Sequence, residues 1–212
     1  MADCLDFYGN SIVILFSHNL MQVAIGHDNK RGNDKFFGGR FAPEDAVKGP
    51  LTGEIEVAHA CGLRKLYREA GIAEHQLEDY RQIGDEPTKS NVPNRSTVGR
   101  ILLSTYAFWA VAKKGVELPE HTIEAAEMGN RRFVPVINVL RSGLLVRGHP
   151  DKFNPFHAKE LANALLTLRR MTDDGNPAFD RFRTQLLALK LCGFDIDWYL
   201  STIDESLRQR KI

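Results

Sequence analysis

The residues best suited to chemistry lie in the segment 64–72, RKLYREAGI. Its spacing is typical of the end of a helix, on which Lys65, Arg68 and Glu69 are one turn or less apart and share one patch. Two cations beside one carboxylate predict a site of net positive charge. Such a site repels a divalent metal ion and attracts a phosphate directly, because both cations donate charge-assisted hydrogen bonds to phosphate oxygens.

A helix over residues 54–70 is predicted to position these side chains. It follows Gly53 and is expected to end at Gly71, where a left-handed C-terminal cap favours glycine. The acids Glu54 and Glu56 in the first turn suit the positive end of the helix dipole. Residues at three-and-four spacing predict its buried face: Ile55, Ala58, Gly62 and Leu66.

The segment resembles the Nudix box, a pattern of the form G-x5-E-x7-R-E-U-x-E-E-x-G-U in which U is aliphatic. Six residues fall in its register: Glu56, Arg64, Leu66, Glu69, Gly71 and Ile72. The leading glycine corresponds to Gly39 in the stretch Phe36-Phe37-Gly38-Gly39-Arg40. Two departures matter. Eleven extra residues separate Gly39 from Glu56, and Lys65 and Arg68 stand where the pattern has glutamates.

In the family, this helix presents carboxylates that hold Mg²⁺ or Mn²⁺, and the metal polarises a diphosphate for attack by water. The resemblance therefore implies Glu56 and Glu69 as catalytic residues. If the protein is active, it implies Glu69 and Glu127 (or Glu124) as metal ligands and Mg²⁺ or Mn²⁺ as cofactor. Hard cations need oxygen ligands, so the exchange of two glutamates for Lys65 and Arg68 argues against a family-type metal cluster.

For a protein that binds its ligand without a metal, the candidate contacts are the cations and the glycine pair. They are Arg64, Lys65, Arg68, Gly38 and Gly39. The alternative for Arg64 is an internal ion pair with Glu56 or Glu69.

Before the helix, residues 11–25 are predicted as a β-hairpin. Residues 41–53 are expected to be an inserted loop in which Glu44 and Asp45 are solvated. After the helix, residues 73–95 are polar and rich in turn-forming residues, so we predict a loop there.

Residues 99–111 are the strongest strand candidate and are apolar enough for the centre of a sheet. Within them, Tyr106, Phe108 and Trp109 could stack a base or sugar, although a place in the core is favoured. The sequence RRFVPV at 131–136 resembles the strand that follows the metal-ligand loop in many Nudix proteins.

The rest of the chain predicts helices. They cover 136–147, 157–170, 177–192 and a last segment from Asp195 or Asp197 through Leu207. We expect an α/β protein, a Nudix-like α/β/α sandwich with a mixed sheet and a C-terminal helical extension. Residues 1–172 would form the Nudix-like domain, and 173–212 a helical hairpin packed on it or on a partner.

The amino-acid composition excludes few classes of protein. The 212 residues carry a formal net charge of +1, which gives no general reason to expect nucleic acid or an anionic membrane as partner. The three cysteines form no C-x-x-C pair and indicate a reducing, cytoplasmic location. No signal peptide and no membrane-spanning segment is expected.

Three functions follow as hypotheses. The first is a degenerate Nudix-fold protein that binds a nucleoside-diphosphate-type small molecule with weak or no hydrolysis. The second is an active, metal-dependent pyrophosphohydrolase with relocated carboxylate ligands. The third is a non-catalytic scaffold that forms a homodimer or contacts a protein partner through its C-terminal helices.

Overall fold

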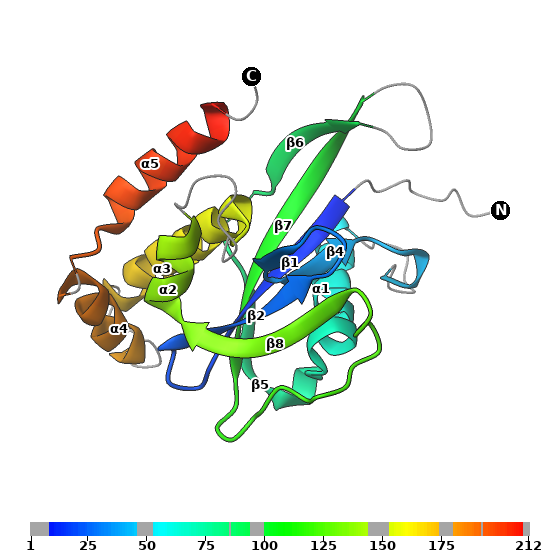
Figure 1. Cartoon of the computed structure of the whole chain (residues 1–212), viewed down its shortest axis with the longest axis horizontal. Helices are drawn as coiled ribbons and strands as arrows, with labels where there is room; N and C mark the ends of the chain where they lie inside the picture. The colour runs from blue at the N-terminus through cyan, green and yellow to red at the C-terminus, as the bar shows by residue number, and fades with distance from the viewer. Residues whose placement is uncertain are drawn as a thin grey trace.

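A mixed sheet of eight strands forms the centre of the computed structural model, which describes residues 9–45, 53–84, 86–93, 100–143, 153–173, 180–191 and 193–209 (Figure 1). The strands are β1 (Gly9–Phe16), β2 (Gln22–Asp28), β3 (Asn33–Lys35), β4 (Phe37–Arg40), β5 (Leu77–Gln82), β6 (Thr88–Pro93), β7 (Arg100–Ala112) and β8 (Met128–Pro135). The main path of the sheet is β3-β2-β1-β7-β5, with β4 paired to β1, β6 to β7 and β8 to β2.

Strands β1 and β7 form the middle of the sheet and pair in parallel, from Gly9 opposite Ser104 to Phe16 opposite Val111. Residues 11–16 of β1 are all buried, as expected for a central strand covered on both faces. The predicted strand at 99–111 and the antiparallel hairpin of β1 and β2 are therefore confirmed. The aromatic residues of β7 belong to the core, as favoured: Tyr106, Phe108 and Trp109.

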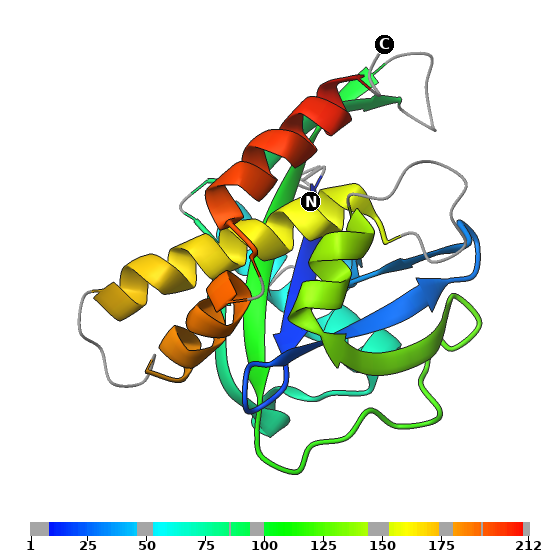
Figure 2. The same ribbon diagram turned by 60° about the vertical axis from the view of Figure 1, so that its left-hand side comes forward.

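Helices cover both faces of this sheet (Figures 1 and 2). They are α1 (Glu54–Lys65), α2 (Val136–Gly143), α3 (Pro155–Asp173), α4 (Asp180–Leu191) and α5 (Ile196–Gln209). Helix α1 packs on the face that presents Val13 and Leu15, whereas α2, α3, α4 and α5 pack on the face that presents Ile12 and Ile14. The α/β/α sandwich is thus confirmed. None of the described helices is both long and apolar enough to span a bilayer.

The last two helices pack on the sandwich itself. Leu189 of α4 and Ile196, Tyr199 and Ile203 of α5 share one buried cluster with α3 and the sheet. In Figure 2, α5 lies alongside α3. These residues are therefore buried within the chain, whereas Leu187 and Leu191 of α4 and Trp198 of α5 are exposed.

Two expectations about local structure are wrong. Residues 77–82 and 88–93 are strands β5 and β6, which pair with the C-terminal and N-terminal halves of the long strand β7. Pairing with β7 overrides their loop-like composition, since strand formation depends strongly on context. Ile55, expected in the buried face of α1, is 50% exposed.

The close approach of α1 to the sheet gives a first prediction. A Cβ at Gly62 would lie 2.1 Å from Tyr80 Oη and 3.2 Å from Val13 Cγ2. Gly62→Ala should lower the free energy of unfolding by about 1–3 kcal/mol in denaturant melts, because overpacking outweighs the gain of up to about 1 kcal/mol in helix propensity. Adding Tyr80→Phe, which removes the clashing oxygen, should recover part of the loss. Additive losses in the double variant would contradict this packing.

Candidate functional site

Helix α1 continues directly into a π-helical turn, η2 (Leu66–Ala70), which ends at Gly71. Gly71 has a φ of 73° and its N–H donates to the carbonyl of Tyr67, so the predicted left-handed cap is confirmed. Single π-helical turns are rare and occur frequently at functional sites. The residues at this end of the helix are therefore presented by irregular backbone.

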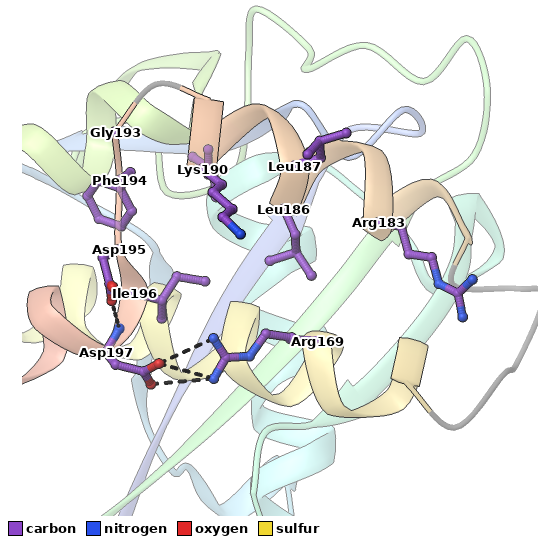
Figure 3. Close-up of a pocket in the computed structure, with 11 residues that line it drawn as sticks. Arg169, Arg183, Leu186, Leu187, Lys190, Gly193, Phe194, Asp195, Ile196 and Asp197 are labelled. Atoms are coloured by element: carbon purple, nitrogen blue, oxygen red, sulfur yellow. Dashed lines mark hydrogen bonds and ion pairs between the residues drawn. The ribbon is translucent and has the colours of Figure 1, made fainter.

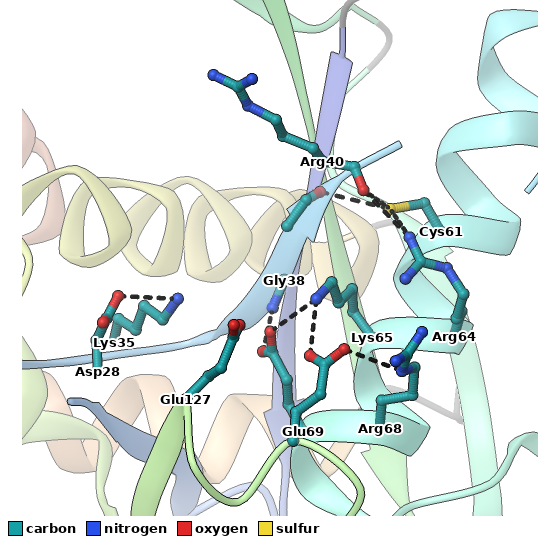
Figure 4. A network of polar contacts seen from close by, with 12 residues as sticks. Asp28, Lys35, Gly38, Arg40, Cys61, Arg64, Lys65, Arg68, Glu69 and Glu127 are labelled. Atoms are coloured by element: carbon teal, nitrogen blue, oxygen red, sulfur yellow. Dashed lines mark hydrogen bonds and ion pairs between the residues drawn. The ribbon is translucent and has the colours of Figure 1, made fainter. Parts of the chain in front are cut away.

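Lys65 lies between two carboxylates, one from η2 and one from the loop before β8 (Figure 4). Its Nζ is 3.4 Å from Glu69 Oε1 and 2.7 Å from Glu124 Oε2. Arg68 Nε is 2.9 Å from Glu124 Oε1. We call Lys65, Arg68, Glu69 and Glu124 the Lys65 cluster. The predicted patch of net positive charge is wrong, because Glu124, distant in sequence, compensates the second cation.

Three of the four side chains of the cluster are largely shielded from solvent, whereas that of Arg68 is 37% exposed. The side chains of Lys65 and Glu124 are each 13% exposed and that of Glu69 is 4% exposed. Burial raises the pKa of Glu69, and Lys35, the N–H of Gly38 and Lys65 offset only part of this rise. Burial alone would lower the pKa of Lys65, but the hydrogen bond to Glu124 and the charge of Glu69 outweigh it and leave that pKa raised. Lys65 is therefore charged at neutral pH.

Strand β4 and the residue before it are held next to the cluster by acceptors from both helical layers. The N–H of Gly38 donates to Glu69 Oε2 at 2.9 Å, and the N–H of Phe36 donates to Nδ1 of His157 on α3 at 3.0 Å. Burial lowers the pKa of His157 to about 3, so this ring stays neutral and its Nδ1 remains an acceptor. Hydrogen bonds to both helical layers thus hold the backbone at Phe36 and Gly38.

The glycine pair makes room for its neighbours. A Cβ at Gly39 would lie 2.7 Å from Lys65 Cε, and one at Gly38, whose φ is 148°, would lie 2.1 Å from the carbonyl oxygen of Ser11. The ligand-binding role expected for both glycines stays a prediction. In this arrangement the N–H of Gly38 already donates a hydrogen bond to Glu69.

Arg64 forms an internal ion pair, but with a partner that the sequence did not suggest. Its Nε is 2.6 Å from Asp45 Oδ1, and its Nη2 is 2.8 Å from Asp45 Oδ2. The expectation of a solvated Asp45 is wrong, since its side chain is 1% exposed. Glu56 is exposed in the first turn of α1, so the structure does not bring this predicted catalytic residue to the Lys65 cluster.

Other charged residues near the cluster are also paired. Glu127, a predicted metal ligand, is half-exposed and lies 2.5 Å from Lys30 Nζ, and the hydrogen bond from Lys30 lowers the pKa of Glu127. Lys35 was missed by sequence reasoning. Its Nζ is 3.2 Å from Asp28 Oδ2, and its charge also acts on Glu69. Its position immediately before the Phe-Phe-Gly-Gly stretch is the signal that could have identified it.

The residues present do not fit the divalent ion that the Nudix resemblance implies. Mg²⁺ and Mn²⁺ need several oxygen ligands. Here the ammonium of Lys65 lies between Glu69 and Glu124 and pairs with both. Across the described part of the chain, no group of three or more His, Cys, Asp or Glu side chains is placed to hold a metal ion.

A separate pocket of about 570 Å³ lies among α3, α4 and α5 (Figure 3). Its lining mixes apolar residues such as Leu186 and Phe194 with an ion pair, in which Asp197 lies 3.3 Å from Arg169. These helices cover the face of the sheet opposite α1. The Lys65 cluster is the stronger candidate for ligand chemistry, because it gathers two cations and two carboxylates at the end of the box helix. The raised pKa values of Lys65 and Glu69 agree with this choice, since shifted pKa values cluster at functional sites.

Comparison with known proteins identifies the fold. No protein-family profile matches the sequence, and no curated protein matches it. Among solved structures, the chain is similar to the NUDIX domain of Shewanella oneidensis NrtR complexed with ADP ribose, with 17% identity, a TM-score of 0.50 and coverage of 76% of this chain and 87% of that one. The chain therefore has a Nudix fold.

Two further structures are similar but more remote. A NUDIX hydrolase from Alicyclobacillus acidocaldarius has 16% identity and a TM-score of 0.44, with 64% of this chain and 82% of that one covered. An Ap4A hydrolase from C. elegans has 10% identity and a TM-score of 0.48, with 76% and 98% covered.

The buried pair of Arg64 and Asp45 gives a second prediction. Asp45→Asn keeps an acceptor for the N–H of Ala42 but leaves the guanidinium without its charge partner. Because unpairing a buried ion is costly, the free energy of unfolding should fall by about 3 kcal/mol or more. Glu44→Gln, at the exposed neighbouring residue, should change it by about 0.5 kcal/mol or less. Equal effects of both variants in denaturant melts would contradict the assignment.

Proposed function

We propose that this protein binds a nucleoside-diphosphate-linked small molecule at the Lys65 cluster and needs no divalent metal to do so. The observation that carries the proposal is the position of Lys65 Nζ, between Glu69 and Glu124, at a box position where the Nudix pattern has a glutamate. A fixed ammonium there supplies positive charge within the protein itself.

The cluster has the donors that a diphosphate needs. An ammonium carries three N–H donors and a guanidinium five, and neither group has an acceptor. Lys65 and Arg68 can therefore donate to phosphate oxygens, whereas Glu69, held by the N–H of Gly38, keeps Lys65 in place. The guanidinium of Arg64 is already paired with the carboxylate of Asp45, so we assign Arg64 a structural role.

Binding at such a site is expected without efficient cleavage. A metal ion lowers the pKa of a bound water and so generates a nucleophile, in addition to neutralising phosphate charge. The ammonium of Lys65 can do the second but cannot coordinate a water in that way. Glu56, the other carboxylate expected in catalysis, lies exposed at the start of α1. We therefore expect weak or no hydrolysis.

The fold supports this class of ligand. The NrtR domain that resembles this chain was solved in complex with ADP ribose, which contains a diphosphate between two ribosyl groups. A compound of this type is the first ligand to test here.

The third prediction concerns binding. ADP-ribose should raise the melting temperature, because a ligand that binds only the folded chain stabilises it by about 2.7 kcal/mol at 100 times its Kd. The rise should be equal in Mg²⁺ and in EDTA, because Lys65 and Arg68 supply the positive charge in place of a metal ion. By calorimetry, Lys65→Met and Arg68→Met should each weaken binding about tenfold or more, since charge-assisted hydrogen bonds are lost. Lys114→Met, at an exposed turn lysine, is the matched control and should bind as the wild type does.

Two results would overturn the proposal in different directions. Mg²⁺-dependent release of phosphate-containing products that Glu69→Gln abolishes would indicate the active hydrolase. A panel of nucleoside-diphosphate compounds that leaves the melting temperature unchanged, with and without Mg²⁺, would favour the interaction scaffold.

The fourth prediction concerns a variant in which the two cations of the cluster are replaced by carboxylates. The double variant Lys65→Glu and Arg68→Glu places four carboxylates in the cluster and should bind Mn²⁺ measurably by calorimetry or electron paramagnetic resonance, because oxygen ligands replace the two cations. The wild type should show at least tenfold weaker binding. Equal Mn²⁺ affinity of the two proteins would contradict the argument that Lys65 takes the place of a metal ion.

A further inference from the structure

Glu124 bridges the two cations that we assign to ligand binding. Its Oε2 is 2.7 Å from Lys65 Nζ and its Oε1 is 2.9 Å from Arg68 Nε. Two oxygens of one phosphoryl group could occupy the same two positions. If Lys65 and Arg68 bind the ligand as proposed, a carboxylate of the protein stands where the phosphate of that ligand would bind.

We propose that Glu124 determines ligand specificity as an internal competitor, so that only a polyanion such as a diphosphate displaces it efficiently from Lys65 and Arg68. This inference rests on the proposed function, because it assumes that these cations contact the ligand.

Glu124 forms an ion pair with Arg68 but does not accept a hydrogen bond from its Nε–H. Although Oε1 lies close to Arg68 Nε, this buried N–H makes no hydrogen bond with any described residue. The contact is thus an ion pair with unfavourable hydrogen-bond geometry, and the donor remains for a better-placed acceptor. A ligand oxygen can supply that acceptor.

The backbone of Glu124 is held in place independently of its side chain. Its backbone N–H donates to the carbonyl of Arg68 at 2.9 Å, and its carbonyl accepts from the N–H groups of Glu127 and Met128 at 3.0 Å each. These bonds hold the loop in place while the side chain rotates. Displacement then needs a rotamer change and hydration of one carboxylate.

Charge explains why a diphosphate displaces Glu124 more readily than a monoanion does. Exchanging one carboxylate for a singly charged ligand leaves the charge next to Lys65 and Arg68 unchanged, and exchanging it for inorganic phosphate adds at most about one negative charge. A diphosphate brings additional charge and oxygens, and the nearby cation Lys35, whose charge already acts on Glu69, increases its attraction. The carboxylate of Glu124 therefore lowers the binding affinity of weakly charged ligands most.

The test compares inorganic pyrophosphate with inorganic phosphate by calorimetry in EDTA. The wild type should bind pyrophosphate at least tenfold more tightly than phosphate. Glu124→Gln, which keeps the size of the side chain but removes its charge, should bind both anions more tightly and should gain at least threefold more for phosphate than for pyrophosphate. Glu120→Gln removes a charge from the same loop and should behave as the wild type does.

Each outcome has a distinct meaning. If the wild type binds pyrophosphate but Glu124→Gln gains no affinity for either anion, the specificity role of Glu124 is overturned and the proposed function stands. If neither protein binds pyrophosphate, the proposed function fails as well. Because unpairing Lys65 can destabilise the fold, Glu124→Asp is a second variant. It keeps the charge but shortens the bridge, and its phosphate affinity should fall between those of the wild type and Glu124→Gln.

Discussion

The site depends on the ion pairs that the ammonium of Lys65 forms with Glu69 and Glu124. A charged lysine with a side chain that is 13% exposed is stable only with such partners, because burial of an unpaired charge costs several kcal/mol. The same pairs keep both carboxylates near the cation. The cluster is therefore neutral as a unit, and a ligand that binds there, as proposed, would exchange one ion pair for another.

The sheet and the helices make this arrangement possible. Lys65 is the last residue of α1, the π-helical turn η2 adds Arg68 and Glu69, and the loop before β8 adds Glu124. Gly39 leaves space for the lysine side chain. The N–H of Gly38 holds Glu69, while His157 holds the residue before β4 from the opposite face. Packing on both sides of the sheet thus determines where the charges meet.

Much of the fold could be predicted from the sequence, because periodicity and capping signals are local. The cap at Gly71, the central strand at 99–111 and the helical C-terminal part followed from such signals. The partners in the site could not be predicted. Asp45 and Glu124 lie 19 and 59 residues from Arg64 and Lys65, respectively, and their pairing depends on the folded chain. Strands β5 and β6 were missed for a related reason, since pairing with β7 defines them.

The proposed function requires that Lys65 take the place of the metal ion in this Nudix fold. The most direct measurement is the anomalous diffraction of a crystal soaked in Mn²⁺ and ADP-ribose together. We expect density for the diphosphate on Lys65 and Arg68, with no manganese peak beside Glu69. An ordered manganese ion bound to Glu69, with Lys65 displaced from Glu124, would contradict the proposed function.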